Sequence, residues 1–232
     1  MKDCADIMAK VKKLNAPYYS GISKLLMAFN LGLATSCWGD VPYAKAFEGE
    51  ANLTPAYDAQ SVVYDSIQSL LDQSIDDFRK PAGLINPTSD DLIFRGDAKK
   101  WLETARALKA RYYMHLSKRD LNAASKVIGI LSQGTILSNA AQPNFPFENT
   151  TNGANPIASF GVQRPGQLAL GKPLVDLLVQ RSDPRLNRYT RLVSGNYVVY
   201  SATTPTMFWA QNNAPMPLIS FAEVKFLLAE SI

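Results

Sequence analysis

Few residues of this chain have the type and spacing that catalysis requires. Its 232 residues include one histidine, His115, which lies in a helix-like segment and is more typical of a structural residue than of a catalyst. The chain has no Gly-x-Ser-x-Gly elbow, no phosphate-binding glycine loop and no His-x-x-x-His pair. Cys4 and Cys37 do not have the spacing of metal ligands. We therefore expect no catalytic residue, no metal site and no cofactor.

Glycan hydrolysis would need two carboxylates that face each other across a sugar. The available aspartates are Asp40, Asp58, Asp90, Asp91 and Asp97. Asp58 and Asp97 have the position of helix N-caps, and the sequence does not mark any two of the five as a pair. A glycan-processing enzyme is therefore a less favoured alternative.

Aromatic and amide side chains are better placed for sugar binding. The C–H faces of a sugar stack on Trp and Tyr, and its hydroxyls form hydrogen bonds with amides. One irregular segment near the C-terminus contains both kinds of residue. From it we predict a ligand surface made by Tyr197, Tyr200, Phe208, Trp209, Gln211 and Asn212. The alternative, which the sequence leaves open, is that Phe208 and Trp209 fill a gap under the last helix.

Helices are expected to position these residues. Apolar residues recur at helical spacing over 1–14, 20–35, 58–80, 97–116 and 120–131. The first helix has Ile7, Val11 and Leu14 on one side. In the second, Leu25 and Leu33 belong to an apolar stripe that we expect to face the core.

Capping residues mark the starts of three helices. Asp58 is expected to cap the third helix, with Tyr57 and Val62 as its hydrophobic staple, and Asp97 to cap the fourth. Ser220 and Glu223 have the spacing of a capping box at the start of the last helix. The apolar residues of this last helix have no partner further along the chain, and we expect them to lie on the surface: Phe221, Val224, Phe226, Leu227 and Leu228.

Composition limits the partners. The formal net charge is +4, and the basic residues form no block, so we expect no nucleic-acid partner. No apolar stretch reaches the 18 or so residues of a membrane span. We expect three parts: a helical-hairpin body over 1–132, a loop-rich insertion over 133–219 that includes the predicted ligand surface, and the start of a further helix over 220–232.

Six short motifs occur in a fixed order along the chain. They are Trp38-Gly39-Asp40-Val41-Pro42-Tyr43, Pro55-Ala56-Tyr57-Asp58-Ala59-Gln60, Gly96-Asp97 ahead of Lys100-Trp101, Leu108-Lys109-Ala110-Arg111-Tyr112, Asp183-Pro184-Arg185-Leu186, and Ala222-Glu223-Val224-Lys225-Phe226-Leu227-Leu228-Ala229-Glu230. Together they resemble the SusD/RagB family of Bacteroidetes outer-membrane nutrient-binding lipoproteins, in particular its SusD-like subgroup.

The resemblance implies a mainly α fold of irregular tetratricopeptide-like helical hairpins with long loop-rich insertions, truncated here at both ends. Trp38 and Tyr43 are expected to anchor a loop in the core, Trp101 to lie in the core, and Arg185 to form an ion pair or hydrogen bond within a turn. The motif residues expected to be structural are Trp38, Gly39, Asp40, Pro42, Tyr43, Tyr57, Asp58, Gly96, Asp97, Trp101, Asp183, Pro184 and Arg185.

The resemblance also implies a function. Such a protein binds a glycan or other small nutrient at the bacterial surface, without catalysis, and delivers it to a SusC-type TonB-dependent transporter in the outer membrane. The resemblance implies that a lipid anchor holds it there, and we expect that anchor to lie outside this fragment. An intracellular helical-repeat scaffold that binds another protein is the alternative from a different class.

Overall fold

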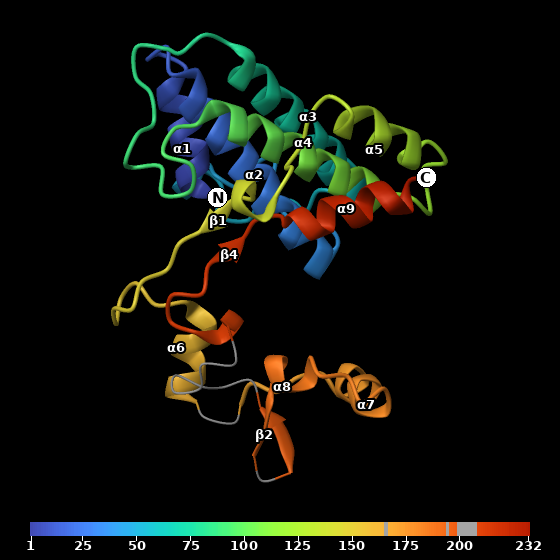
Figure 1. Cartoon of the computed structure of the whole chain (residues 1–232). Helices are drawn as coiled ribbons and strands as arrows, with labels where there is room; N and C mark the ends of the chain where they lie inside the picture. The colour runs from blue at the N-terminus through green and yellow to red at the C-terminus, as the bar shows by residue number, and fades with distance from the viewer. Residues whose placement is uncertain (165–166, 194, 199–207) are drawn as a thin grey trace. The chain divides into compact units, whose positions relative to one another are not determined.

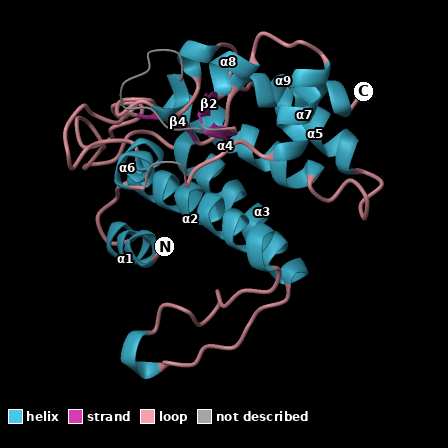
Figure 2. Cartoon of the chain, turned by 90° about the horizontal axis from the view of Figure 1, so that it is seen from below, coloured by secondary structure: helices cyan, strands magenta, loops and turns pink. Residues whose placement is uncertain are grey.

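The computed structural model describes residues 1–164, 167–193, 195–198 and 208–232. Most of the described secondary structure is helix, joined by long loops (Figures 1 and 2). The chain forms two compact units. One, the helical body, consists of residues 1–143 and 217–232, and the other, the insertion unit, consists of residues 144–216. The limits predicted from the sequence are 132/133 and 219/220.

Six α-helices of the described chain make the helical body. They are α1 (Lys2–Val11), α2 (Pro17–Trp38), α3 (Gln60–Arg79), α4 (Ala98–Met114), α5 (Ala123–Leu131) and α9 (Phe221–Glu230). Helices α1 to α5 each pack against their neighbours in the chain order within this series, and α9 packs against α4 and α5. Two single-turn 3₁₀ helices, η1 (Gly49–Ala51) and η2 (Asn139–Ala141), lie in its loops.

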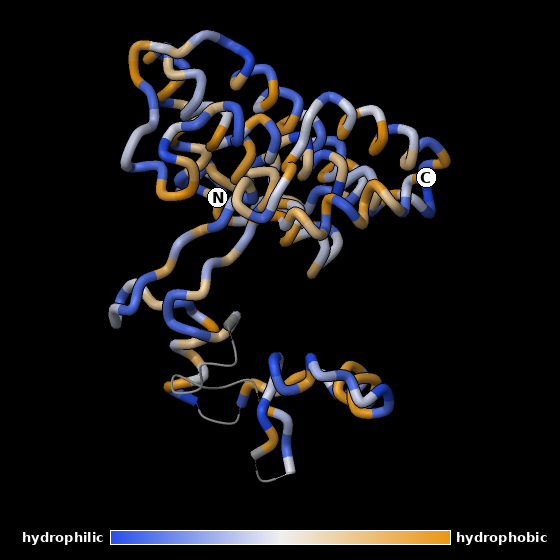
Figure 3. The backbone as a smooth tube through the Cα atoms, viewed as in Figure 1, coloured by the Kyte–Doolittle hydropathy of each residue, from blue (hydrophilic) through white to orange (hydrophobic). Residues whose placement is uncertain are grey.

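The core of the body is the contact region of α2, α3 and α4. The predicted stripe of α3 is buried along its whole length, because this helix has a neighbour on both sides. Figure 3 shows apolar and polar residues alternating along these helices, as amphipathic packing requires. The largest fully buried side chains of the body include Trp101, Tyr112, Leu25, Met27, Leu31, Ile67, Leu71 and Leu108.

The first two helices differ in detail from the expectation. Helix α1 ends at Val11, and Ile7 and Leu14 are exposed. The residues of α1 that contact the core include Cys4 and Met8. Because α1 lies at the end of the row of helices, it buries only one side. Leu33 of α2 is also exposed, so the predicted core stripe of this helix is wrong at its last position.

The expectation that the last helix has no partner is wrong. Val224 and Leu227 of α9 are buried against the rest of the body, whereas Phe226 is 73% exposed. The chain returns to the body just before α9, where the Leu218 amide donates to the Pro143 carbonyl. Sequence reasoning looked for a partner after α9, but the partners are α4 and α5, about a hundred residues earlier.

The insertion unit is less regular. Its elements are β1 (Asn144–Phe145), α6 (Pro156–Gln163), α7 (Lys172–Gln180), α8 (Leu186–Tyr189), β2 (Arg191–Val193), β3 (Asn196–Val198), η3 (Phe208–Ala210) and β4 (Met216–Pro217), the last of which ends in the body. Strands β2 and β3 form an antiparallel hairpin in which Leu192 pairs with Tyr197, and β1 pairs with β4. No helix among the described residues is long and apolar enough to span a bilayer.

Candidate ligand-binding site

The loop after α2 is fixed by two aspartates, Asp40 and Asp58. The Asp40 Oδ1 atom accepts a hydrogen bond from the Gln60 amide at 2.8 Å, so Asp40 satisfies the start of α3. Asp58 does not cap this helix, whose N-cap is Ala59. Instead its Oδ2 atom accepts from the amides of Tyr43 and Ala44 at 2.8 and 2.9 Å. The Asp58 cap predicted from the sequence is therefore wrong.

Two aromatic residues of this loop region lie outside the core. Trp38 is 75% exposed and Tyr57 is 73% exposed, so neither the predicted anchoring by Trp38 nor the staple of Tyr57 with Val62 is present. Gly39 has a φ of +74°, which ends α2 and turns the chain away directly after Trp38. Tyr43 is half-buried and packs edge-on against Phe47.

The start of α4 matches its prediction. The Asp97 side chain accepts from the Lys100 amide at 3.1 Å, and Gly96 adopts a φ of +86° just before it. Trp101 is 1% exposed, and its Nε1 atom donates to Asp91 Oδ2 at 2.7 Å. Sequence reasoning did not find this role of Asp91, because its partner follows ten residues later.

The Asp183-Pro184-Arg185 turn is closed by its own ends. Arg185 Nη2 lies 2.6 Å from Asp183 Oδ2. Hydrogen bonds from the Arg185 side chain and amide lower the pKa of Asp183 to about 2. Both charges of the turn are thus used locally, which is the structural role that the sequence favours.

The predicted ligand surface lies in the insertion unit. Tyr197, in β3, is half-buried, and its carbonyl accepts from the Leu170 amide at 3.1 Å. Trp209, in η3, is also half-buried and belongs to a small apolar cluster around Ala210 that includes Leu170. Segment 168–170 therefore contacts both β3 and the Trp209 cluster.

The remaining predicted ligand residues are placed in part. The backbone carbonyl of Gln211 accepts from the Ala214 amide, and that of Asn212 accepts from the Asn155 amide at 2.7 Å. Both amide side chains thus stand on an ordered turn next to Trp209. The structure places the backbone of Phe208 in η3, and Tyr200 lies outside the described residues.

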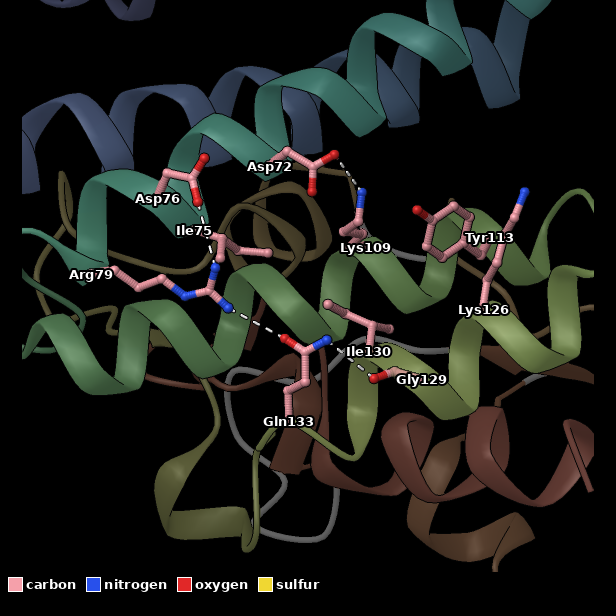
Figure 4. A pocket seen from close by; sticks show the side chains of 10 residues that line it. All are labelled: Asp72, Ile75, Asp76, Arg79, Lys109, Tyr113, Lys126, Gly129, Ile130 and Gln133. Carbon is pink, nitrogen blue, oxygen red and sulfur yellow. Dashed lines mark hydrogen bonds and ion pairs between the residues drawn. The ribbon is translucent and has the colours of Figure 1, made fainter.

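A polar cleft in the helical body was missed by sequence reasoning. It is a cavity of about 390 Å³ between α3, α4 and α5, which we call the α3–α5 cleft. Figure 4 shows its side chains, which include the ion pair of Asp72 with Lys109. Lys109 is 5% exposed and also donates to Gln68 Oε1 at 3.1 Å. The sequence signal of the cleft is Lys109, which lies between the apolar residues Leu108 and Ala110 of a helical motif.

His115 has a structural position. It caps the C-terminus of α4, and its Nδ1 atom lies 3.1 Å from the Tyr64 hydroxyl. Burial and the nearby Arg111 lower the pKa of His115, which favours the neutral ring. Burial raises the pKa of the neighbouring Tyr112 to about 12. Within the described ranges no group of three His, Cys, Asp or Glu residues is arranged to hold a metal ion.

Solved structures share this fold. The chain is similar to a SusD/RagB family protein from Bacteroides thetaiotaomicron, with 28% identity and a TM-score of 0.81 over 99% of this chain and 53% of that chain. It is also similar to a chitin-binding protein, with 22% identity and a TM-score of 0.78 over 99% of this chain and 55% of that one. A SusD homologue from Bacteroides fragilis has 20% identity and a TM-score of 0.74, over 98% and 56%.

The chain thus spans about half the length of these solved relatives. A comparison with curated proteins found no match. A family model, SusD-like and described as starch-binding and associating with the outer membrane, matches residues 1–232. The motifs, the helical-hairpin body and this match over the whole chain agree, and the chain belongs to the SusD-like family.

Proposed function

We propose that this protein binds a glycan or another small nutrient at the outer surface of the bacterial outer membrane, without catalysis. The observation that carries the proposal is the match of all 232 residues to a family described as starch-binding and associated with the outer membrane. The sequence supports it, because it lacks the nucleophile, base and phosphate-binding motifs of common enzymes. In this proposal the ligand then passes to a SusC-type TonB-dependent transporter.

The ligand contacts are proposed to lie around Trp209. This ring is anchored by the cluster around Ala210 yet keeps part of its surface in solvent, as a stacking platform needs. Gln211 and Asn212 follow it on an ordered turn and can supply hydrogen bonds to sugar hydroxyls. Tyr197 lies on strand β3, which also contacts segment 168–170.

Titration of the full-length protein tests this placement. Trp209→Ala should weaken glycan binding by about ten- to hundredfold, the equivalent of an aromatic contact of roughly 1.5–3 kcal/mol. Trp209→Phe should retain most of the affinity, because it keeps an aromatic face. Circular dichroism is recorded in parallel. An unchanged affinity, or a loss of helicity, would remove Trp209 from the ligand surface and favour its role as a packing residue.

The delivery step needs a separate test. The protein should co-purify from detergent-solubilised outer membranes with a TonB-dependent transporter, and protease added to intact cells should degrade it. Recovery in the cytosolic fraction, with no transporter attached, would contradict the proposal and favour the helical-repeat scaffold.

A further inference from the structure

We propose that the α3–α5 cleft is a second saccharide-binding site, which takes one or two sugar units of the glycan. The inference rests on the proposed function, since it names a further site for the same class of ligand. The cleft has a volume of about 390 Å³, which is within the range of small-ligand pockets. Three packed helices form its walls, so the cavity is built on rigid elements and not on loops.

The lining combines an apolar middle with polar ends. Ile75 and Ile130 lie between two polar groups, as Figure 4 shows. On one side Lys109 donates to Asp72 at 2.9 Å. On the other side Arg79 donates to the side chain of Gln133 at 3.3 Å. A sugar has the matching pattern, because its C–H face is apolar and its hydroxyls point outward from the ring edge.

The charges of the cleft favour a neutral ligand. Lys109 is paired with Asp72, and Arg79 lies 3.5 Å from Asp76. The third cation, Lys126, lies 2.7 Å from Asp120. Each of these three cations therefore already has an acidic partner. A ligand with a full charge would have to compete with these pairs, whereas a hydroxyl can accept from a cation and donate to a carboxylate in the same network.

Gly129 is a position at which the cleft can be probed by substitution. It lies in the last turn of α5 and lines the cleft. Glycine is the least favourable residue after proline inside a helix, so it usually has a packing reason. Here a Cβ atom at Gly129 would meet no heavy atom within 4 Å. No neighbour in the described chain requires the glycine, and the position is exposed, so it can carry a larger side chain as a probe of the cleft.

The test uses full-length protein with labelled isoleucine methyl groups, because Ile75 and Ile130 line the cleft and Ile157 lies in the cluster of Trp209. The probes are maltose and N,N′-diacetylchitobiose, with free glycine as a zwitterionic control. We expect at least one disaccharide to shift the Ile75 and Ile130 methyl signals saturably, and free glycine to leave them unchanged.

Two variants at one position make the test specific. Gly129→Phe fills the cleft and should raise the Kd reported by Ile75 and Ile130 at least tenfold, whereas Gly129→Ala adds one methyl group and should change it less than twofold. Arg79→Gln is a third variant, at another position of the cleft, and it adds no bulk. It should raise the same Kd about three- to tenfold. It decides the question if the phenylalanine variant does not fold.

The outcomes separate this inference from the proposed function. Disaccharide shifts at Ile157 alone, equal affinity in the Gly129→Phe variant, or a response to free glycine would overturn the cleft as a saccharide site and leave glycan binding intact. If no saccharide shifts any methyl signal and calorimetry shows no binding, the glycan binding in the proposed function itself is contradicted.

Discussion

At the scale of single residues, one buried carboxylate of the helical body has four hydrogen-bond donors. The Asp91 carboxylate accepts from the amides of Ile93, Phe94 and Gly96 as well as from Trp101. It joins the turn before α4 to the largest fully buried side chain of that helix, Trp101. The Trp101 ring in turn packs edge-on against Phe94 at a centroid distance of 5.1 Å.

Trp101 variants are expected to act through folding. Trp101→Ala removes a fully buried ring and should lower the free energy of unfolding of the full-length protein by about 3–5 kcal/mol. Trp101→Phe keeps a ring but leaves Asp91 without one donor, which should cost about 1.5–3 kcal/mol. Urea unfolding measures both. A variant that kept its melting temperature and lost glycan binding would show that Trp101 belongs to the ligand site.

Asp77 gives a stability that depends on pH. Burial raises the pKa of Asp77, but hydrogen bonds from Lys24, Lys80 and Ser20 outweigh it, and the pKa lies below its ordinary value of 3.8. A carboxyl with a depressed pKa in the folded state stabilises the fold above the unfolded pKa. This stability is lost as the pH falls through the folded pKa.

Asp77→Asn should therefore destabilise the protein at neutral pH by about 3 kcal/mol, because Lys24 keeps a largely buried charge without its partner. The difference between the wild type and the variant should shrink below a pH of about 4. Urea unfolding at pH 7 and at pH 3 measures it. A difference that stays constant or grows at pH 3 would contradict the assigned pKa direction.

Residue roles could be predicted where both partners are close in sequence. Asp97 and Lys100 are three residues apart, and the cap follows from helix geometry alone. The predicted cap at Asp58 is wrong because the partners of this side chain are the amides of Tyr43 and Ala44. These amides belong to a loop whose path depends on the chain reversal at Gly39. The α3–α5 cleft could not be predicted, since three helices have to meet before it exists.

At the scale of elements, α9 is attached to the body by both charge and burial. Arg111 of α4 donates to both carboxylate oxygens of Glu223, at 2.5 and 2.7 Å, and to the Leu218 carbonyl at 2.9 Å. The Ser220 hydroxyl accepts from the Glu223 amide, which is the first half of the predicted capping box. The Glu223 carboxylate forms an ion pair with Arg111 of α4, so it joins two helices.

Two neighbouring large apolar residues on α9, one exposed and one buried, can be compared. Leu227→Ala should lower the free energy of unfolding by about 2–4 kcal/mol, because Leu227 is 7% exposed in the core of the body. Phe226→Ala, one residue earlier, should change it by less than about 0.5 kcal/mol, because the ring is exposed. Thermal unfolding compares them. Equal effects would show that α9 does not pack as described.

Helix existence could be predicted from periodicity, but helix partners could not. The stripe of α3 identified its core face, because an apolar repeat records how much of a helix is buried. It does not record which helix covers it. For α9 no sequence pattern indicates α4 and α5 as partners, and the return of the chain at Leu218 decides it.

At the scale of the whole molecule, a helical body and a less regular insertion unit have different roles in this account. The body supplies rigid packing and the α3–α5 cleft, and the insertion unit carries the half-buried aromatic residues and the amides that we propose as ligand contacts. The family follows from motifs spread along the chain, whereas binding residues are carried disproportionately by loops, which vary more in sequence than the elements they connect.

The most direct measurement is calorimetric titration of the full-length protein with oligosaccharides from starch, chitin, cellulose, xylan, mannan and pectin, with the saccharides analysed by chromatography afterwards. The account predicts saturable binding of at least one of them and recovery of that saccharide at unchanged chain length. Absence of saturable binding across the panel, or the appearance of shortened products, would contradict the claim that this protein is a non-catalytic glycan-binding protein.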